Sequence, residues 1–413
     1  MTQPAASGRS LAGRPPYGSA RGVAGALALL TAVRLVTNTG YRFLYPFLPV
    51  VARGLGVSIE RAGLLVSAMS LGGVAAPIVT GLNARAGERH RRLAAFALLS
   101  FAMGTAVAAA TTVYVGVLAG FVLLGVAKPL YDVAAHSYLA DRTAYERRAR
   151  VLAVIELTWA GALLVGAPAV GWLIDRAGWQ APLWVLAALA LASLAAMPLV
   201  LEPDRPQAAT RGERSRLDRS SLALLAAMAV FTYAAEVTFV VFGAWLEEDF
   251  GLSVLALGGL STFIGVAELV GSGAVVAFAD RVGKRRSVAI GLVVSAGGFA
   301  LVPATDQLTT GLASLAVALL GFEYAYVAAI PLASESRPGA RSRYLALVVV
   351  ATTLPRALAA ATGPTLFTAI GVAANAALSV AANLAGLVLL LAFVDERDPA
   401  RPVTRSRGGK PGA

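Results

Sequence analysis

A small set of charged and polar side chains interrupts the long apolar stretches of this sequence. The members whose types could bind or move a charged species are Arg34, Asn38, Tyr41, Arg42, Lys128, Asp132, Glu236, Glu268, Glu323 and Arg356. If the apolar stretches cross a bilayer, a charge near its centre costs about 2.5–3.5 kcal/mol or more. Such residues are therefore expected to face a polar cavity and to have a function there.

The chemistry open to this set is the binding of protons and organic ions. Burial in apolar surroundings favours the neutral form of a carboxylic acid, and a nearby cation favours the charged form. The three glutamates of the set are thus candidate proton carriers. Lys128 and Asp132 are four residues apart, on one helical face, so Asp132 could simply neutralise Lys128. His136 extends this face by one turn, either as a proton relay or as a satisfied structural residue.

The composition places these side chains in a membrane protein. The 413 residues are 57% hydrophobic and 14% charged, with a mean hydropathy of +0.71, whereas soluble proteins carry roughly 25% charged residues. The sequence has no cysteine and two histidines, which excludes thiolate metal sites and disulfides. It has no nucleophile with a neighbouring base and no phosphate-binding Gly-x-x-x-x-Gly-Lys-Ser/Thr loop. We therefore expect no enzyme, no ATP-driven pump, no metal and no cofactor.

A polar segment, EPDRPQAATRGERSRLDR at residues 202–219, separates two apolar halves. It cannot bury enough apolar surface to offset the entropy cost of ordering it. The halves repeat each other: Gly56-Val57-Ser58 corresponds to Gly251-Leu252-Ser253, and Pro168 to Pro364, at offsets of 195 and 196. The expected parts are a disordered N-terminus (1–22), a first bundle (23–201), the linker (202–219), a second bundle (220–394) and a basic tail (395–413).

Twelve apolar stretches are long enough to cross a bilayer, for which a helix needs about 20 residues. They are 23–48, 61–82, 93–111, 113–139, 151–173 and 181–201 in the first half, and 221–246, 254–278, 287–304, 309–333, 344–369 and 372–394 in the second. The sequence therefore predicts an all-α membrane protein made of two six-helix bundles related by pseudo-symmetry.

The basic residues predict the orientation. With both termini in the cytoplasm, 28 of the 35 Lys and Arg residues fall in inner segments and three in outer loops, as the positive-inside rule requires. The excess of Arg over Lys suggests a bacterial source, and hence the cytoplasmic (inner) membrane. The net charge of +12 is dispersed over seven segments, which favours lipid headgroups over nucleic acid as the partner. Near the outer boundary, an aromatic belt of lipid anchors is expected from Trp172, Trp179, Trp184 and Trp245.

Two bundles joined by a central linker resemble the major facilitator superfamily. The segment ADRVGKRR at residues 279–286 is similar to a loop signature of that family, and residues 81–92 keep much of it, with Ala84 at its acidic position. In the family this loop helps to hold the inner side closed. The latch residues that the resemblance implies are Arg85, Gly87, Asp141, Asp280, Arg281, Gly283 and Glu335. We expect Arg281 to pair with Glu335 and Arg85 with Asp141, unless these charges only set the topology.

Two further features agree with the resemblance. The segment GALLVGAPAVG at residues 161–171 is similar to a Gly/Pro-rich signature of the family's drug/proton antiporter branch, although generic close packing of helices explains it equally well. In the family fold, the third, sixth, ninth and twelfth spans face lipid and the other eight line a cavity. In this sequence, those four spans carry no charge in their cores.

The repeat offset of 195 pairs Lys128 with Glu323. If the repeat holds, the two side chains face each other across the pseudo-two-fold axis, near the midplane where transporters of this kind bind substrate. An ion pair there could break when a proton or a substrate arrives, or it could be a static pair that joins two helices.

The remaining charges divide into proton carriers and partners. The family resemblance favours Glu236 and Glu323 as proton carriers, because their spans line the centre of the cavity. Glu268 is expected to pair with Arg356. Glu156 is expected near the inner end of the fifth span, with Arg150 or Arg281 as its partner, and Arg42 is expected either to contact substrate or to extend outward.

The function that the resemblance implies is secondary transport by alternating access. Within it we favour proton-coupled efflux of a small amphipathic organic compound by a monomer, because the cavity carries carboxylates in an otherwise apolar lining. One alternative is an importer or facilitator of an organic anion, with Arg34, Arg42 and Lys128 as its binders. Another is a receptor or scaffold that transports nothing, which would need neither buried charges nor a repeat. The substrate and the direction of transport do not follow from the sequence.

Overall fold

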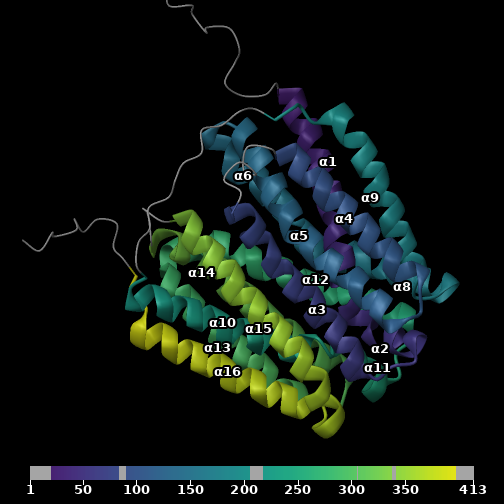
Figure 1. Ribbon diagram of the computed structural model, residues 1–413. Helices are drawn as coiled ribbons and strands as arrows, with labels where there is room; N and C mark the ends of the chain where they lie inside the picture. Colours follow the sequence, from purple (N-terminus) through teal and green to yellow (C-terminus); the bar gives the residue numbers. More distant parts are fainter. Residues whose placement is uncertain (1–19, 83–89, 205–216, 305, 337–340, 397–413) are drawn as a thin grey trace, which may run out of the picture.

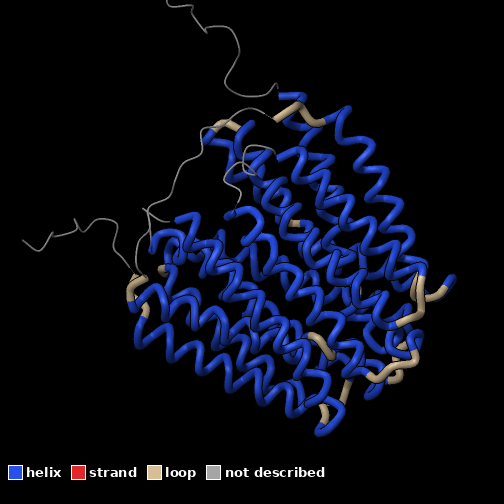
Figure 2. Tube along the Cα trace, viewed as in Figure 1, coloured by secondary structure: helices blue, strands red, loops and turns tan. Residues whose placement is uncertain are grey.

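The computed structural model describes residues 20–82, 90–204, 217–304, 306–336 and 341–396. Over these residues the chain forms helices joined by short loops, without a strand (Figure 2). Eleven helical segments among them are long and apolar enough to cross a membrane, and α3, with 24 residues, makes the twelfth. The prediction of an all-α protein with twelve spanning helices is confirmed.

The first six spans form one bundle, shown in purple to teal in Figure 1. The first span is a helix in two parts, and the fifth span contains a π-helical turn, Ala162–Gly166. The helices are α1 (Ala20–Arg42), α2 (Leu44–Leu55), α3 (Ile59–Leu82), α4 (His90–Ala110), α5 (Tyr114–Arg142), α6 (Tyr145–Glu156), α7 (Thr158–Gly161), α8 (Ala167–Ala177) and α9 (Ala181–Val200).

The last six spans form the second bundle, shown in teal to yellow. Its first span is again a helix in two parts, and its last two spans are joined by one residue, Gly371. The helices are α10 (Arg219–Phe239), α11 (Phe242–Phe250), α12 (Val254–Val282), α13 (Lys284–Leu301), α14 (Leu308–Ser336), α15 (Arg341–Ile370) and α16 (Val372–Phe393).

The two bundles repeat each other in backbone detail. The first span of each is interrupted at a similar depth, at Phe43 and at Val240–Val241. Each then ends at a glycine in the left-handed conformation, Gly56 with φ 62° and Gly251 with φ 63°. These glycines belong to the matched segments on which the repeat was predicted, and a left-handed C-cap is the position where glycine is least strained.

Polar side chains from a neighbouring span stabilise the interruption in the seventh span. The amide of Val241 bonds to Thr238 O rather than continuing the helical pattern to Val237 O. The amide nitrogen of Asn375, on α16, donates to the released carbonyl of Val237 at 2.7 Å and to Gly363 O at 2.9 Å. A buried carbonyl in an apolar medium needs such a donor, which explains an asparagine that is fully buried in the last span.

The two halves are sealed at one end only. We call the end where α1 begins and α16 ends the basic end. Hydrogen bonds between described residues of the two halves all lie between the middle of the spans and the opposite end. At that opposite end Thr368 donates to Glu60, Ser67 donates to Ala357 O, and α2 packs on α11 (Figure 1). Over the described residues, the molecule is therefore open toward its basic end.

An ion pair at the rim of the sealed end joins Arg53 of α2 to Glu247 of α11. Arg53 is 60% exposed, and exposed pairs contribute about 0–1 kcal/mol. We expect Glu247→Gln to change the transport rate less than about fivefold, with the effect shrinking as salt rises. Transport assays at low and high ionic strength test this. A complete loss of transport would show that the pair contributes more to the closed end than its exposure implies.

The lipid-facing surface agrees with the predicted distribution of charge. Helices α4 and α9 lie on the outer side of one half, and α13 and α16 on that of the other (Figure 1). The aromatic belt is only half right: Trp172 and Trp184 are exposed, whereas Trp179 and Trp245 are buried. The Trp179 indole packs against Gly54, where a Cβ would lie 2.2 Å from its Nε1, and Trp245 packs edge-on against Phe250. These two rings fill protein interior instead of anchoring in lipid.

Candidate functional site

The centre of the molecule contains a buried ion pair that bridges the two halves. Arg42 is the last residue of α1, and Glu268 lies at the middle of α12. The Arg42 guanidinium binds both carboxylate oxygens of Glu268, at 2.6 and 2.7 Å. Both side chains are less than a tenth exposed. This two-pronged geometry is the strongest form of a charged hydrogen bond, so Arg42 is neither free to bind an anion nor extended toward the surface.

The same guanidinium is held to its own half. It lies over the indole of Trp159, 4.5 Å from the ring centroid, and also donates to Trp159 O at 3.2 Å. On the other side it lies 5.5 Å from the ring of Phe239, which belongs to the second half. A cation stacked on aromatic faces in this way is stabilised by their quadrupoles. Trp159 therefore positions Arg42 at the seam between the bundles.

A second bridge lies beside the first. Glu236 of α10 accepts a hydrogen bond from the phenol of Tyr45 on α2 and pairs with Arg356 of α15 at 3.0 Å. The Tyr45 ring also stacks on Phe239, with centroids 4.9 Å apart. Glu236 is 2% exposed. Its charge is thus matched by Arg356 within its own half, while Tyr45 connects it to the other half.

Glu323 differs from the other central carboxylates. It lies at the middle of α14, is 8% exposed, and accepts a hydrogen bond from Ser272 Oγ at 2.9 Å. Among the described residues no Lys or Arg forms an ion pair with it. Ser272 is one helical turn beyond Glu268 on α12, so Glu268 and Glu323 are neighbours across the packed pair α12 and α14.

A network inside the first half collects the remaining charges. Arg34 Nε lies 3.0 Å from Asp132 Oδ1, and its Nη1 lies 2.9 Å from Glu156 Oε2 and 2.8 Å from Ile155 O. Lys128 pairs with Asp132 one turn away, and its ammonium lies 5.5 Å from the centroid of the Trp159 ring. Here each cation faces a carboxylate.

Several predicted side chains lie at the edges of these clusters. Asn38 Nδ2 donates to Thr158 Oγ1 at 3.1 Å, and Tyr41 is buried one turn before Tyr45. His136 Nδ1 donates to Asp132 O, 2.7 Å away, and its Nε2 lies 2.7 Å from Glu156 Oε1.

Three predicted pairings near the centre are different in the structure. Lys128 pairs with Asp132 rather than with Glu323. The four-residue spacing of Lys128 and Asp132 had left this pairing open. Glu268 pairs with Arg42, not with Arg356, and Glu156 contacts Arg34 and His136. The physical reason is that a repeat identifies equivalent positions, whereas contact depends on helix rotation and on how far the halves have rocked.

Three side chains that organise the centre were not predicted from the sequence: Trp159, Tyr45 and Ser272. Each is an uncharged residue in an apolar run, so nothing in composition distinguishes it. The available signal was spacing, because Tyr45 lies one turn from Tyr41 and Ser272 lies one turn from Glu268. Trp159 gave no such signal, since it becomes central only through the interruption of the fifth span at Leu157.

The Gly/Pro-rich stretch of the fifth span serves close packing. It forms the π-helical turn and the start of α8. A Cβ on Gly166 would lie 2.3 Å from Thr39 Oγ1, and one on Gly171 would lie 3.2 Å from the Cα of Gly258 in the other half. Small residues let the backbones of α8 and α12 approach. The packing explanation therefore accounts for this stretch, and an antiporter role remains a prediction.

The predicted latch of the second half is built differently. Gly283, with φ 91°, joins α12 to α13. Lys284, not Arg281, pairs with Glu335, and the N-terminus of α13 is capped by Glu396, whose carboxylate accepts from the amides of Lys284 at 2.9 Å and Arg285 at 3.3 Å. An anion at a helix N-terminus is favoured by the unpaired amides there. The capping anion is thus Glu396, and the described contacts give Asp280 no part in this cap.

The first half repeats this arrangement. Asp141 lies 2.8 Å from His90, and Asp204, beyond the sixth span, accepts from the amide of Arg91 at the start of α4 at 2.8 Å. Arg85 and Gly87, predicted for this latch, lie outside the described residues. Both clusters join elements of a single half, so in this open arrangement neither acts as a latch between halves.

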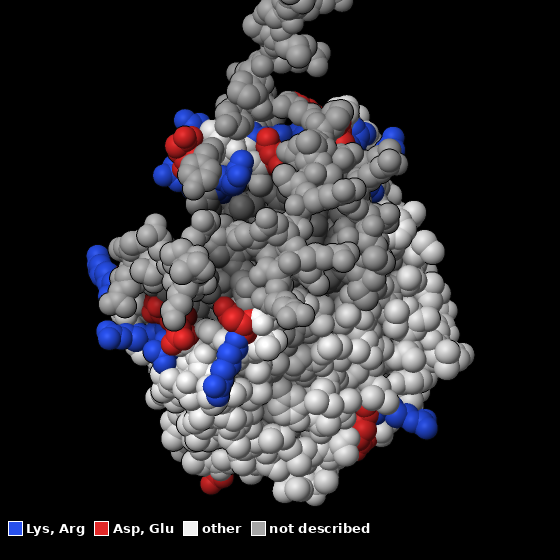
Figure 3. Space-filling model, turned by 60° about the vertical axis from the view of Figure 1, so that its left-hand side comes forward, with Lys and Arg blue, Asp and Glu red and all other residues white. Residues whose placement is uncertain are grey.

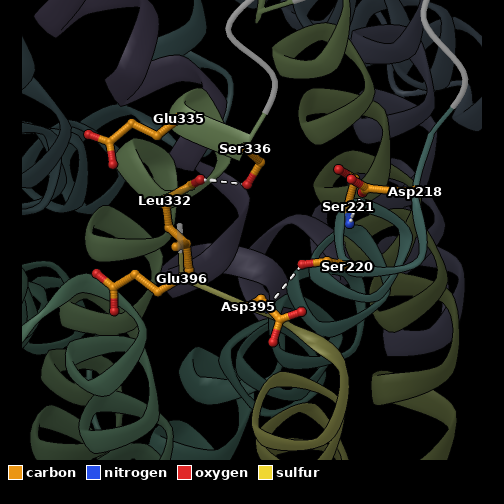
Figure 4. A pocket seen from close by; sticks show the side chains of 8 residues that line it. All are labelled: Asp218, Ser220, Ser221, Leu332, Glu335, Ser336, Asp395 and Glu396. Atoms are coloured by element: carbon orange, nitrogen blue, oxygen red, sulfur yellow. Dashed lines mark hydrogen bonds between the residues drawn. The ribbon is translucent and has the colours of Figure 1, made fainter. Parts of the chain in front are cut away.

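Two recesses lie near the cluster of the second half, which contains Glu335 and Glu396. One, of about 20 Å³, is lined by Asp218, Ser220, Ser221, Leu332, Glu335, Ser336, Asp395 and Glu396 (Figure 4); a site of this size holds about one water molecule. The other is an open surface recess of about 510 Å³ beside Asp280 and Arg281. Neither touches the central charges, so we do not assign the transported molecule to them.

The surface charges gather at the basic end. Figure 3 shows most of the visible Lys, Arg, Asp and Glu side chains there in two groups, one on each half. Glu156, in the third of the fifth span nearest the basic end, has 54% of its side chain exposed. A charge at that depth is tolerated where it lines a water-filled cavity.

Comparison with known proteins agrees with the fold. The family model described as Major Facilitator Superfamily matches residues 30–231 and 222–412. Among solved structures, a peptide transporter POT covers 92% of this chain and 95% of its own, with a TM-score of 0.71 and 13% identity. The human organic anion transporter MFSD10 (TETRAN) covers 91% of this chain and 100% of its own, with a TM-score of 0.65 and 18% identity. At these identities the likeness concerns the fold alone.

Curated relatives match part of the chain. A chloramphenicol resistance protein of Streptomyces lividans is 30% identical over 221 residues, which is 52% of this chain and 56% of that protein. The inner membrane transport protein YdhP of Escherichia coli K12 is 29% identical over 152 residues, 36% of this chain and 38% of that protein. The chain thus matches only about half, or less, of the length of these relatives.

Proposed function

The chain belongs to the major facilitator superfamily, and we propose that it exports a small amphipathic organic compound in exchange for protons. Membership makes it an integral membrane transporter with a small-molecule substrate. The finer statement rests on one observation: the central charges are balanced except at Glu323. Arg34 and Lys128 face Asp132 and Glu156, Arg42 faces Glu268, and Arg356 faces Glu236.

An unmatched buried carboxylate is suited to exchange one cation for another. Charged, Glu323 would bear a large desolvation penalty in the membrane. A proton removes that penalty, and so does a cationic or strongly polar group of a substrate. If the two compete for Glu323, each transport cycle carries the proton one way and the substrate the other.

Alternating access supplies the two directions. The present arrangement is open at the basic end, which the positive-inside rule places in the cytoplasm. A substrate would enter there, and rocking of the two halves would open the opposite end. The relative from Streptomyces lividans, named for chloramphenicol resistance, supports efflux and suggests chloramphenicol as a first compound to try.

The alternative of an organic-anion importer is less well supported. It would need free cations in the centre, yet Arg34, Arg42 and Lys128 are each bound to a carboxylate. An anion would have to displace those carboxylates, leaving them buried and unmatched. A receptor or scaffold would require neither the paired charges nor the one-sided opening.

The test is substrate-evoked proton movement in inverted membrane vesicles. We expect chloramphenicol or a related amphipathic compound to dissipate an imposed pH gradient, followed with a fluorescent probe. Glu323→Gln is expected to abolish this effect, because an amide can neither release a proton when the substrate enters nor pair with the substrate in the proton's place, so the exchange cycle stops. Glu248→Gln, an exposed residue near the opposite end, is the matched control and should behave as the wild type.

The outcomes separate the alternatives. If labelled compounds equilibrate across the membrane and no compound moves protons, a facilitator replaces the exporter. If only anionic compounds cross the membrane, the result supports the organic-anion importer over the exporter. If Glu323→Gln moves protons as well as the wild type does, Glu323 is not the carrier.

A further inference from the structure

In the described part of the chain, Glu268 and Arg42 form the one central charge pair whose members belong to different halves. The Arg34, Lys128 and Arg356 pairs each lie within a half, so they can persist as the halves rock. The Arg42–Glu268 pair cannot persist in this way, because Arg42 moves with α1 of the first half and Glu268 moves with α12 of the second. Among the described residues Arg42 is the cation bound to Glu268, and it spans the seam between the bundles.

Arg42 would stay with the first half when the halves separate. Its other contacts, the indole face and carbonyl of Trp159, belong to that half. Trp159 therefore keeps the guanidinium stacked and partly hydrogen-bonded after Glu268 withdraws. Glu268 has no comparable reserve, since the next cation in the second half, Arg356 of α15, is bound to Glu236 of α10.

Withdrawal of Arg42 leaves two neighbouring carboxylates in the second half. Glu323 faces Ser272, one turn from Glu268, and Glu268 and Glu323 act on each other electrostatically, as Arg42 and Arg356 act on Glu323. Two adjacent carboxylates in a poorly solvated site do not both stay ionised without a cation. Glu323 would hold the proton of the exchange, and Glu268, buried and deprived of its only bound cation among the described residues, would be favoured in its neutral form by the same desolvation, so that it takes up a second proton from the side that has opened.

We propose that Glu268 is a second proton-binding site of the transporter and that Arg42 is the moving counter-ion that empties it. With the opposite end open, the Glu268 carboxylate binds a proton from that side. When the seam closes, Arg42 replaces the proton: the O–H bond of Glu268 breaks, the carboxylate pairs with the guanidinium, and the proton leaves toward the basic end. One proton thus crosses per cycle in addition to the one exchanged at Glu323.

The proposal rests on the exporter function, and its test counts protons. In proteoliposomes, the membrane potential and pH gradient at which net substrate flux is zero give the number of protons per substrate. The neutral double variant Arg42→Gln/Glu268→Gln keeps the seam free of an unmatched charge, which single variants do not. We expect it to transport with one proton fewer than the wild type. An unchanged proton number would overturn the second site, whereas wild-type transport with no proton dependence would overturn the exporter function instead.

A second measurement needs a folded protein but no transport. Ser67 is buried at the seam, where it bonds to Ala357 O of the other half, and the sequence has no cysteine. When it is added to intact cells, a membrane-impermeant maleimide should label Ser67→Cys only while the opposite end is open. Relative to the exposed reference Glu248→Cys, labelling should rise as the outside is acidified, because protonated Glu268 releases Arg42. In the double-Gln background the relative labelling should not respond to pH, and a response equal to that of the single Cys variant would refute the proposal.

Discussion

Replacing Gly125 with alanine is expected to destabilise the first bundle strongly. A Cβ at this position would lie 1.8 Å from Met69 O and 2.7 Å from Met69 C. Both are backbone atoms of α3, so neither can rotate away as a side chain would. Overpacking of a core costs about 1–3 kcal/mol, sometimes more, and a backbone clash this deep lies at the upper end. The two helices must separate, which also opens the contact of Gly72 with Val122 O.

The measurement is the yield and thermal stability of the protein in detergent. We expect Gly125→Ala either to leave little monodisperse protein or to lower the apparent melting temperature by at least about 5 °C. Gly297→Ala is the matched control, because Gly297 is exposed on α13 and a Cβ there meets nothing within 4 Å. Equal stability of the two variants would mean that α3 and α5 are not packed as closely as described.

The second large effect is a shift in conformation, expected for Gly243→Ala. Gly243 lies in α11 at the sealed end, and a Cβ would lie 2.3 Å from Pro46 O and 2.7 Å from Tyr45 O. Those atoms belong to α2 of the other half, so the clash exists only while the opposite end is closed. A penalty of about 1–3 kcal/mol on one state moves the equilibrium between the states about 5- to 150-fold. The variant should therefore fold normally and favour the state open at the opposite end.

Labelling of Ser67→Cys by the impermeant maleimide reports this shift directly. We expect faster labelling with Gly243→Ala than without it, together with slower transport, because the state open at the basic end becomes rare. Gly259→Ala is the control, since a Cβ on that exposed glycine of α12 meets nothing within 4 Å. If Gly243→Ala labels as slowly as the control, the close approach of α2 and α11 does not govern the seal.

The spans, the division into halves and the placement of charge were readable from the sequence. A helix that crosses a bilayer must be apolar over most of its length, so each predicted span lies within a few residues of the helix found. The short connections Thr111–Val113 and Gly371 separate distinct helices as expected. The repeat was visible because Gly56 and Gly251 both serve as left-handed caps, a role that restricts the residue type.

The partners of the charges were decided only by the tertiary structure. Arg42 and Glu268 are 226 residues apart, and Arg34 and Glu156 are 122 apart, so no local rule connects them. Which carboxylate a guanidinium reaches depends on the rotation of each helix, on interruptions such as those at Phe43 and Leu157, and on the rocking of the halves. Lys128 illustrates the limit: its symmetry mate is Glu323, yet Asp132 lies one turn away on the same helix and binds it first.

The sequence by itself determined that the chain is a two-bundle membrane protein with charges in its cavity-lining spans, because bilayer energetics act on each span separately. The tertiary structure alone decided which carboxylate is left unmatched and which ion pair crosses the seam. Those properties belong to pairs of distant residues, and pairs are formed by packing.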